Sequence, residues 1–165
     1  PYNSIMKLRN FCYRYVLKSM GENSNIIDGV TIVNPKKVSI GDKVSIHPYT
    51  YILGEVTIGN YVGIASKCSI IAETHNTADI SIPYKMQGIE DQPVSIGNDV
   101  WIGAHSIILG NSIIGDGVII SAGSVVSGEI PPYSVVMGNP ARVYFNRKKS
   151  VFNKKIGSNE SRKTR

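Results

Sequence analysis

The stretch Ile96-Gly97-Asn98-Asp99-Val100-Trp101-Ile102-Gly103-Ala104 opens a run in which every sixth residue is isoleucine or valine. An equivalent run occurs earlier in the chain. The sixth positions of the two runs are Ile40, Ile46, Ile52, Ile58, Ile64 and Ile70, and then Ile96, Ile102, Ile108, Ile114, Ile120 and Val126. Neither the helical period of about 3.6 nor the strand period of 2 explains a strict period of six. A repeating coil explains it, in which each unit supplies a short β-segment and a bend.

Three such units make one triangular turn of the coil. A single unit cannot bury its isoleucine alone, so successive turns are expected to stack around a continuous dry interior. The residues that follow each isoleucine are often Gly, Ala, Asn or Asp, which tolerate the backbone angles of tight turns. The sequence therefore predicts an all-β solenoid of about five coils over residues 26–145.

Two segments depart from the repeat inside the chain. Apolar residues recur at three- and four-residue steps between 4 and 20, which predicts a helix within residues 1–25, with Ser4 as its N-cap and Gly21 as its stop. We expect its apolar face to pack on the first coil as a cap, and the alternative is a helix on a membrane surface. The register breaks once, which predicts a loop insertion at residues 72–93 on the binding side of the solenoid.

The net charge of +6 belongs to the end of the chain. Residues 146–165 carry a net charge of +7, which leaves −1 for the rest. We expect a flexible basic tail there, with contact to an anionic membrane as the alternative. No groove-reading motif supports a nucleic-acid partner. The sequence shows no secretory signal, and its two cysteines, Cys12 and Cys68, are expected to be buried thiols in the reducing cytoplasm.

Four further segments of the second run accompany the stretch quoted above. They are Ile114-Gly115-Asp116-Gly117, Ser121-Ala122-Gly123-Ser124, Ile130-Pro131-Pro132 and Gly138-Asn139-Pro140-Ala141-Arg142. Together they resemble the hexapeptide-repeat acetyltransferases, in the maltose and galactoside O-acetyltransferase branch that includes capsule and O-antigen sugar O-acetyltransferases. The resemblance implies a left-handed parallel β-helix and a homotrimer with acetyl-CoA between adjacent coils. It also implies acetyl transfer to a sugar hydroxyl in capsular polysaccharide or lipopolysaccharide O-antigen biosynthesis.

The resemblance places a catalytic histidine on the inserted loop, where this chain has Glu73-Thr74-His75-Asn76. O-acetyl transfer needs a base that removes the hydroxyl proton and returns it to the leaving thiolate, which an imidazole does near neutral pH. His75 is the only histidine in that loop and is the candidate general base. Glu73 or Asp79 is a candidate to orient it, and Asn76 to bind the acceptor sugar. Each of these residues has the alternative of an ordinary solvated loop side chain.

The resemblance also suggests where coenzyme A and the acceptor bind. Trp101 is a candidate wall for the pantetheine arm or the acceptor, and the alternative is an outward aromatic that fills space between coils. The cofactor candidates are Gly103, Ala104, Ser121, Ala122, Gly123 and Arg142. Small residues let the cofactor lie close to the coil backbone, and an arginine binds phosphate. Backbone N–H groups near Gly103 and Ala104, or near Ala122 and Gly123, are candidates for an oxyanion site.

Two other function classes share this fold. An N-acetyltransferase for an amino sugar or a xenobiotic would use the same histidine, and a β-helix trimer without catalysis would keep only the coil. Zinc enzymes of this coil class use two closely spaced histidines and a third. This chain instead spaces His47, His75 and His105 by 28 and 30 residues, so we expect no metal.

Overall fold

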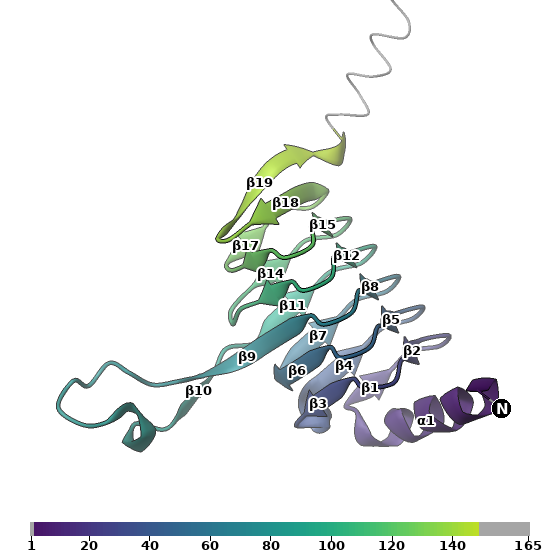
Figure 1. Ribbon diagram of the computed structural model, residues 1–165, viewed down its shortest axis with the longest axis horizontal. Coiled ribbons are helices and arrows are strands. Elements are labelled where there is room, and N and C mark those ends of the chain that lie inside the picture. The colour runs from purple at the N-terminus through teal and green to yellow at the C-terminus, as the bar shows by residue number, and fades with distance from the viewer. Residues whose placement is uncertain (1, 149–165) are drawn as a thin grey trace, which may run out of the picture.

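The computed structural model describes residues 2–148 and shows one helix followed by a three-sided stack of short strands (Figure 1). The helix α1 spans Tyr2–Val16. Strands from successive turns of the chain pair in parallel and form three sheets. We call them sheets I, II and III, and the corners between them the I–II, II–III and III–I edges.

Sheet I is β1 (Ser19–Met20), β4 (Val38–Ile40), β7 (Val56–Ile58), β11 (Val94–Ile96), β14 (Ile113–Ile114) and β17 (Glu129–Ile130). Sheet II is β2 (Asn25–Ile26), β5 (Ser45–Ile46), β8 (Gly63–Ile64), β12 (Trp101–Ile102), β15 (Ile119–Ile120) and β18 (Ser134–Gly138), with β19 (Ala141–Asn146) added antiparallel. Sheet III is β3 (Thr31–Val33), β6 (Tyr51–Gly54), β9 (Ser69–His75), β13 (Ile107–Ile108) and β16 (Val125–Val126). This architecture confirms the predicted parallel β-helix with one N-terminal helix. The stack is slightly longer than the five coils expected, because a sixth turn adds β17 and β18.

The predicted sixth positions form the core. None of the twelve is more than 3% exposed. The strand register stacks them in columns, as where Ile58 pairs with Ile96 and Ile96 with Ile114. Burial of each side chain stabilises the fold by about 1.5–3 kcal/mol as an upper estimate. The hydrophobic interior is therefore continuous from the first turn to the last.

The glycines after the core isoleucines serve close stacking and not unusual backbone angles. A Cβ on Gly59 would lie 2.6 Å from the carbonyl oxygen of Gly97 in the next turn. The left-handed bend falls two residues later, at Lys43, Tyr61 and Asp99, with φ of 56°, 60° and 54°. The predicted reason, tolerance of turn angles, holds for Gly54 and Gly128, with φ of 86° and 75°, whereas the glycines directly after the core isoleucines serve close stacking.

The Asp and Asn residues in these turns cap the turn below. The carboxylate of Asp42 accepts a hydrogen bond from the Glu22 N–H at 2.7 Å, and the Asn60 side chain does the same for Asp42 at 2.8 Å. Asn98 and Asp116 continue this ladder along the I–II edge. The polar residues of the repeat thus satisfy backbone donors that the strand pairing leaves free.

Helix α1 differs from its prediction in length and in orientation. It begins before Ser4 and ends at Val16, and Ser19–Met20 already pairs with β4 as the first coil strand. It packs on the coil through Tyr13, near which Leu17 is buried, and through Arg9 and Asn10. Its predicted apolar face points the other way, as Leu8, Tyr15 and Val16 are exposed and so is Cys12, and Phe11 is exposed beside them. The expectations of an inward apolar face and of a buried Cys12 were wrong.

The segment at residues 72–93 is an ordered arm. Strand β9 leaves the coil after Ala72, and its end pairs antiparallel with β10 (Ile89–Asp91), with His75 opposite Ile89. A short 3₁₀ helix η2 (Tyr84–Met86) lies at the tip; a second, η1 (Pro35–Lys37), precedes β4. Figure 1 shows the arm projecting away from the stack at the III–I edge. The predicted interruption is therefore a hairpin that continues a core strand.

The stack closes with the antiparallel pair β18–β19. Arg147 and Lys148, assigned above to the tail, lie on the coil: the Arg147 guanidinium donates to the Gly117 carbonyl at 2.6 Å, and the Lys148 ammonium lies 3.7 Å from the centre of the Tyr133 ring. The rest of the predicted flexible tail, residues 149–165, lies outside the described residues. Between residues 2 and 148 no helix is long and apolar enough to cross a lipid bilayer.

Candidate active site

His75 stands on the arm, at the last position of β9, with an exposed side chain. Its ring packs edge-on against Tyr84, with centroids 5.2 Å apart and planes at 81°. Pairing with Ile89 fixes the backbone on which it stands. Within residues 2–148 no carboxylate hydrogen bonds to the imidazole, so its orientation comes from Tyr84 and from the hairpin.

Tyr84 was missed by the sequence analysis. It is the only Phe, Tyr or Trp between residues 72 and 93, and that signal was available. Its contact with His75 depends on the way the arm folds back, which no local pattern reports.

The polar residues predicted around His75 hold the arm together. Asn76 bonds to the other side of the hairpin twice, through its N–H to the Gly88 carbonyl and through its amide to the Gln87 carbonyl, each at 3.1 Å. The Asp79 carboxylate accepts from the hydroxyl and N–H of Ser81 at 2.6 and 2.8 Å, and these bonds lower the pKa of Asp79. Neither residue contacts the imidazole in this structure.

Glu73 lies at the base of the arm. Its carboxylate accepts a hydrogen bond from the Asn34 amide at 3.2 Å. Beside it, the Lys37 ammonium binds the Asp91 carboxylate at 2.7 Å. The hydrogen bond to Asp91 raises the pKa of Lys37, and Glu73 adds to that effect through its charge. Glu73 therefore ties the arm to the coil, and it does not orient His75 here.

The cofactor candidates gather on a different edge. Gly103 and Ala104 occupy one II–III turn, and Ser121, Ala122 and Gly123 occupy the next turn above. A Cβ on Gly103 would lie 2.5 Å from the Ala122 nitrogen, so the two turns are in contact. Gly123 has φ of +72° and open space within 4 Å of its Cβ position. A narrow ledge of small residues runs along this edge.

Two backbone donors on this ledge are free. Gly103 donates to the Ile120 carbonyl at 2.8 Å and Gly123 to the Ala104 carbonyl at 2.9 Å, so both are used by the coil. Within the described part of the chain, the N–H groups of Ala104 and Ala122 donate to no other group. These two are the donors that an anionic oxygen would find.

Arg142 lies above this ledge. Val136 pairs with Ile120, so the residues that follow, including the turn from Gly138 to Ala141, continue over Ser121. Arg142 is exposed on β19, and within the described residues its guanidinium donates a hydrogen bond only to the carbonyl of its neighbour Ala141, at 2.9 Å. It is therefore available to a phosphate at the end of the ledge.

Trp101 lies on the outer face of sheet II, next to the ledge, and is 48% exposed. Its ring covers Gly63: a Cβ there would lie 2.7 Å from the Trp101 Cε3 atom. A cleft opens beside it, lined by Lys43, Ser45, Tyr61, Gly63, Asp99, Ile119 and Arg147 among others. Gly63 was not predicted to matter, although it is a glycine at a position where the other turns carry Asn, Ser, Trp, Ile or Val.

One chain does not bring all of these residues together. Trp101 and the small residues share sheet II and its II–III edge, whereas His75 projects from the III–I edge, which is opposite sheet II in a three-sided stack. Figure 1 shows the arm on one side of the stack and β8, β12 and β15 on the other. In the described residues, no group of three or more His, Cys, Asp or Glu is placed to hold a metal ion.

A family profile described as bacterial transferase hexapeptide (six repeats) matches residues 37–72 and 93–128. The interval between the two matches is the arm. The Mycobacterium tuberculosis protein Rv3034c, named as an acetyltransferase, is 42% identical over 96 residues, which cover 58% of this chain and 32% of that protein. WbbJ of Escherichia coli K12, named as a lipopolysaccharide biosynthesis O-acetyltransferase, is 36% identical over 115 residues, covering 64% and 59%. The chain thus spans about a third to three fifths of the length of these relatives.

Solved structures agree. A maltose O-acetyltransferase from Clostridium difficile superimposes with a TM-score of 0.78 at 30% identity, over 85% of this chain and 75% of that one. A galactoside acetyltransferase in complex with coenzyme A gives 0.79 at 30% identity, over 85% and 70%. A hexapeptide-repeat acetyltransferase of Vibrio cholerae complexed with acetyl-CoA gives 0.80 at 27% identity, over 85% and 76%.

Proposed function

The chain belongs to the hexapeptide-repeat acetyltransferases, in the branch of the maltose and galactoside O-acetyltransferases, and on this premise we propose that it transfers an acetyl group from acetyl-CoA to a sugar hydroxyl. The observation that carries the proposal is that the chain has both parts of an acyl-transfer site. One is an exposed histidine on an ordered arm, and the other is a ledge of small residues with two backbone N–H groups that the described chain leaves free. The likeness to WbbJ favours an acceptor in lipopolysaccharide or capsule biosynthesis. We place the reaction in the cytoplasm, consistent with the free thiols of Cys12 and Cys68.

The active site requires two copies of the chain. Because the arm that carries His75 leaves the III–I edge, opposite sheet II and Trp101, the arm of one protomer must reach sheet II of a neighbour to complete the site. The arm and sheet II are two different surfaces of the chain, so repeating this contact from copy to copy can close a ring. We propose that the ring is a homotrimer. The exposed apolar residues of the arm, which include Ile80, Met86 and Ile89, suit burial against that neighbour.

In this site the acetyl-CoA thioester lies on the ledge of Gly103, Ala104 and Ser121–Gly123, with Arg142 on a phosphate. Trp101 and the cleft beside it wall the acceptor. Lys43 and Arg147 line the cleft against the single acid Asp99, and this positive balance favours anionic ligands. Asn76 adds an acceptor contact from the arm.

The chemistry follows from these positions. The acceptor hydroxyl attacks the thioester carbonyl while a ring nitrogen of His75 takes its proton. The tetrahedral oxyanion accepts hydrogen bonds from the N–H groups of Ala104 and Ala122. The C–S bond then breaks, and the imidazolium returns the proton to the leaving thiolate. Acetyl ester and free thiol are the products, and the histidine ends as it began.

The test is thiol release from acetyl-CoA against a panel of sugars, nucleotide sugars, amino sugars and polysaccharide fragments. We expect release that depends on a hydroxyl acceptor and falls by about 10²–10⁴-fold in His75→Ala. His47→Ala, a histidine on a coil turn, is the matched control and should retain activity. Release with amino sugars alone would indicate N-acetyl transfer, and no release together with no acetyl-CoA binding by calorimetry would contradict the enzyme.

A further inference from the structure

The outer face of α1 is an apolar stripe with nothing from the described chain upon it. Leu8, Phe11 and Tyr15 are 66%, 55% and 73% exposed, and Val16 is 44% exposed. Steps of three and four residues put Leu8, Phe11 and Tyr15 on one side of the helix, and the rings of Phe11 and Tyr15 pack edge-on with centroids 5.0 Å apart. We call these four residues the α1 stripe. An exposed contiguous apolar patch of this kind is typical of a surface that binds a protein, a membrane or a ligand.

The orientation of the helix is fixed by polar contacts on its other side. Arg9 forms an ion pair with Asp28, and the Asn10 amide donates to the Asn25 side chain at 3.0 Å and accepts from the Ile26 N–H at 3.1 Å. Leu17 is buried just past the helix end. These contacts are incompatible with the stripe turning inward. The polar contacts with the coil therefore hold the helix with its α1 stripe facing outward.

Charge indicates the nature of the partner. The first 20 residues hold four Lys or Arg and no Asp or Glu. Arg9 is paired with Asp28, whereas Arg14 on the helix and Lys18 just past its end are exposed. An apolar groove beside Tyr15 and Val16 continues the stripe and brings Lys36 to its rim. Apolar side chains bordered by exposed basic ones match the acyl and headgroup layers of an anionic bilayer.

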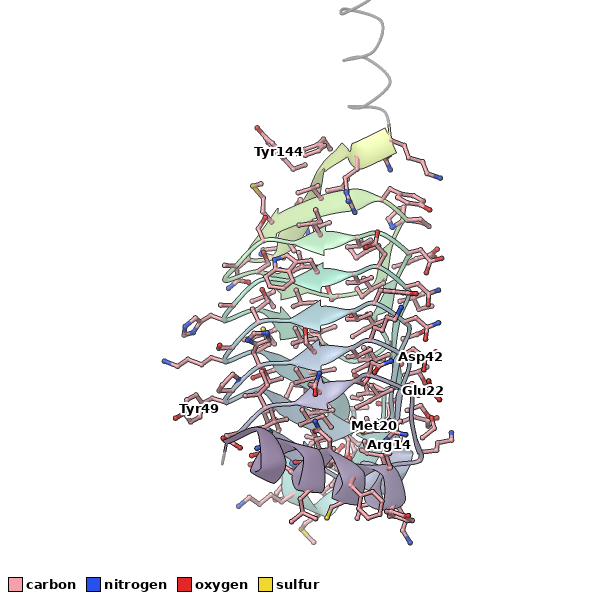
Figure 2. The ribbon with its side chains drawn as sticks, turned by 90° about the vertical axis from the view of Figure 1, so that its right-hand side faces the viewer. Arg14, Met20, Glu22, Asp42, Tyr49 and Tyr144 are labelled. Carbon is pink, nitrogen blue, oxygen red and sulfur yellow. The ribbon has the colours of Figure 1, made fainter. Side chains whose placement is uncertain are left out.

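The position of the helix suits a flat surface. Figure 2 shows α1 lying across one end of the stack, with Arg14 at that end and Tyr144 at the opposite one. Figure 1 shows the tip of the β9–β10 arm across the stack from α1, at about the level of the end where α1 lies. A planar surface that approaches α1 from this end meets the N-terminal end of the coil.

We propose that α1 docks this protein on an anionic lipid bilayer, with the α1 stripe inserted at the interface and Arg14, Lys18 and Lys36 on the headgroups. The helix lies on the surface and does not span the membrane. Docking holds the acetyltransferase where membrane-linked saccharides are found, but the lipid contact itself does not depend on the catalytic activity.

The test is flotation of the full chain with vesicles of phosphatidylglycerol and phosphatidylcholine, compared with vesicles of phosphatidylcholine alone. We expect binding to the anionic vesicles that weakens as salt is raised. The double variant Phe11→Ser/Tyr15→Ser should lose about tenfold or more in partitioning, because both rings are exposed and fold stability does not depend on them. Arg14→Gln and Lys18→Gln should each lose about fivefold.

Tyr144→Ser is the matched control, since Tyr144 is 70% exposed at the other end of the stack, and it should bind like wild type. Deletion of residues 149–165 should also leave binding in place. Three results would overturn the proposal: no binding to anionic vesicles, binding lost with the tail but not with the stripe, or a change of oligomeric state in the double variant without vesicles, which would make the stripe a contact between copies. Thiol release on a soluble acceptor, unchanged in the double variant, separates this test from that of the enzyme.

Discussion

Strand β9 begins as a coil strand and ends as an arm strand, and its two halves show how the molecule divides its tasks. Ile70, between β6 and β13, and Ala72, beside β6, are fully buried, whereas Thr74 and His75 are exposed and pair only with β10. The coil half repeats a pattern found in every turn, and the arm half occurs once. The coil thus supplies stability, and the arm carries the proposed base beyond it.

The comparison also explains why the site is shared. A regular coil leaves its functional atoms in surface turns, such as those of Ala104 and Ala122, and His75 is not on the coil surface but on the arm. A long arm can supply that side chain, but it leaves from the edge opposite sheet II. The arm of a neighbouring copy removes the conflict.

We expect the coil and the arm to differ most in how much a side-chain truncation lowers the free energy of unfolding. Ile102→Ala removes a fully buried side chain from the coil and should lower the free energy of unfolding by about 2–5 kcal/mol. Met86→Ala, at a side chain 73% exposed on the arm, should change it by less than about 0.5 kcal/mol in a dissociated protomer. Urea denaturation measures both. Equal losses would mean that the arm is part of the cooperative core.

A smaller contrast concerns glycine. Gly59→Ala puts a Cβ 2.6 Å from the Gly97 carbonyl oxygen, so two turns must separate, at a cost of about 1–3 kcal/mol to the whole fold. Gly88→Ala meets nothing within 4 Å, but its φ of +82° is unfavourable for alanine by about 1–2 kcal/mol, and only the arm should loosen. Thermal unfolding reports the first and amide exchange of the arm the second. If Gly88→Ala lowered the melting temperature and Gly59→Ala did not, the stability of the whole fold would depend on the arm and not on the close stacking of the turns.

The smallest effect concerns pH. Hydrogen bonds from Ser81 lower the pKa of Asp79 in the folded arm, so the stabilisation is present above the unfolded value of about 3.9 and is lost as the pH falls through the folded pKa. Amide exchange at Ser81 should therefore speed up on acidification before the coil amides respond. Asp79→Asn should remove this step, and its persistence in that variant would assign it to another group.

The repeat explains what the sequence could predict. A period of six specifies which side chains point inward, and Ile102 and Cys68 are as buried as their positions require; burial also raises the pKa of the Cys68 thiol. The break in the period located the arm and His75. These features depend on local patterning, which a single sequence carries.

Features that depend on contacts between distant residues escaped prediction. The helical period located α1 but could not tell that Arg9 and Asn10, through Asp28 and Asn25, would turn its polar side inward. The ring of Tyr84 against His75 likewise requires the folded hairpin. The turns of the Ala104 and Ala122 donors were named from the sequence, but which N–H groups in them the coil leaves free depends on the bonds that Gly103 and Gly123 make to other turns.

The central claim, that one protomer supplies His75 and another supplies Trp101, has a direct test in mixed oligomers. His75→Ala and Trp101→Ala are each expected to have little activity alone. Refolded together in equal amounts, they should recover about one quarter of the wild-type rate, because about one site in four then joins an intact arm to an intact sheet II. No recovery above the two variants, in oligomers shown to contain both chains, would place His75 and Trp101 in the same protomer's site and contradict the account.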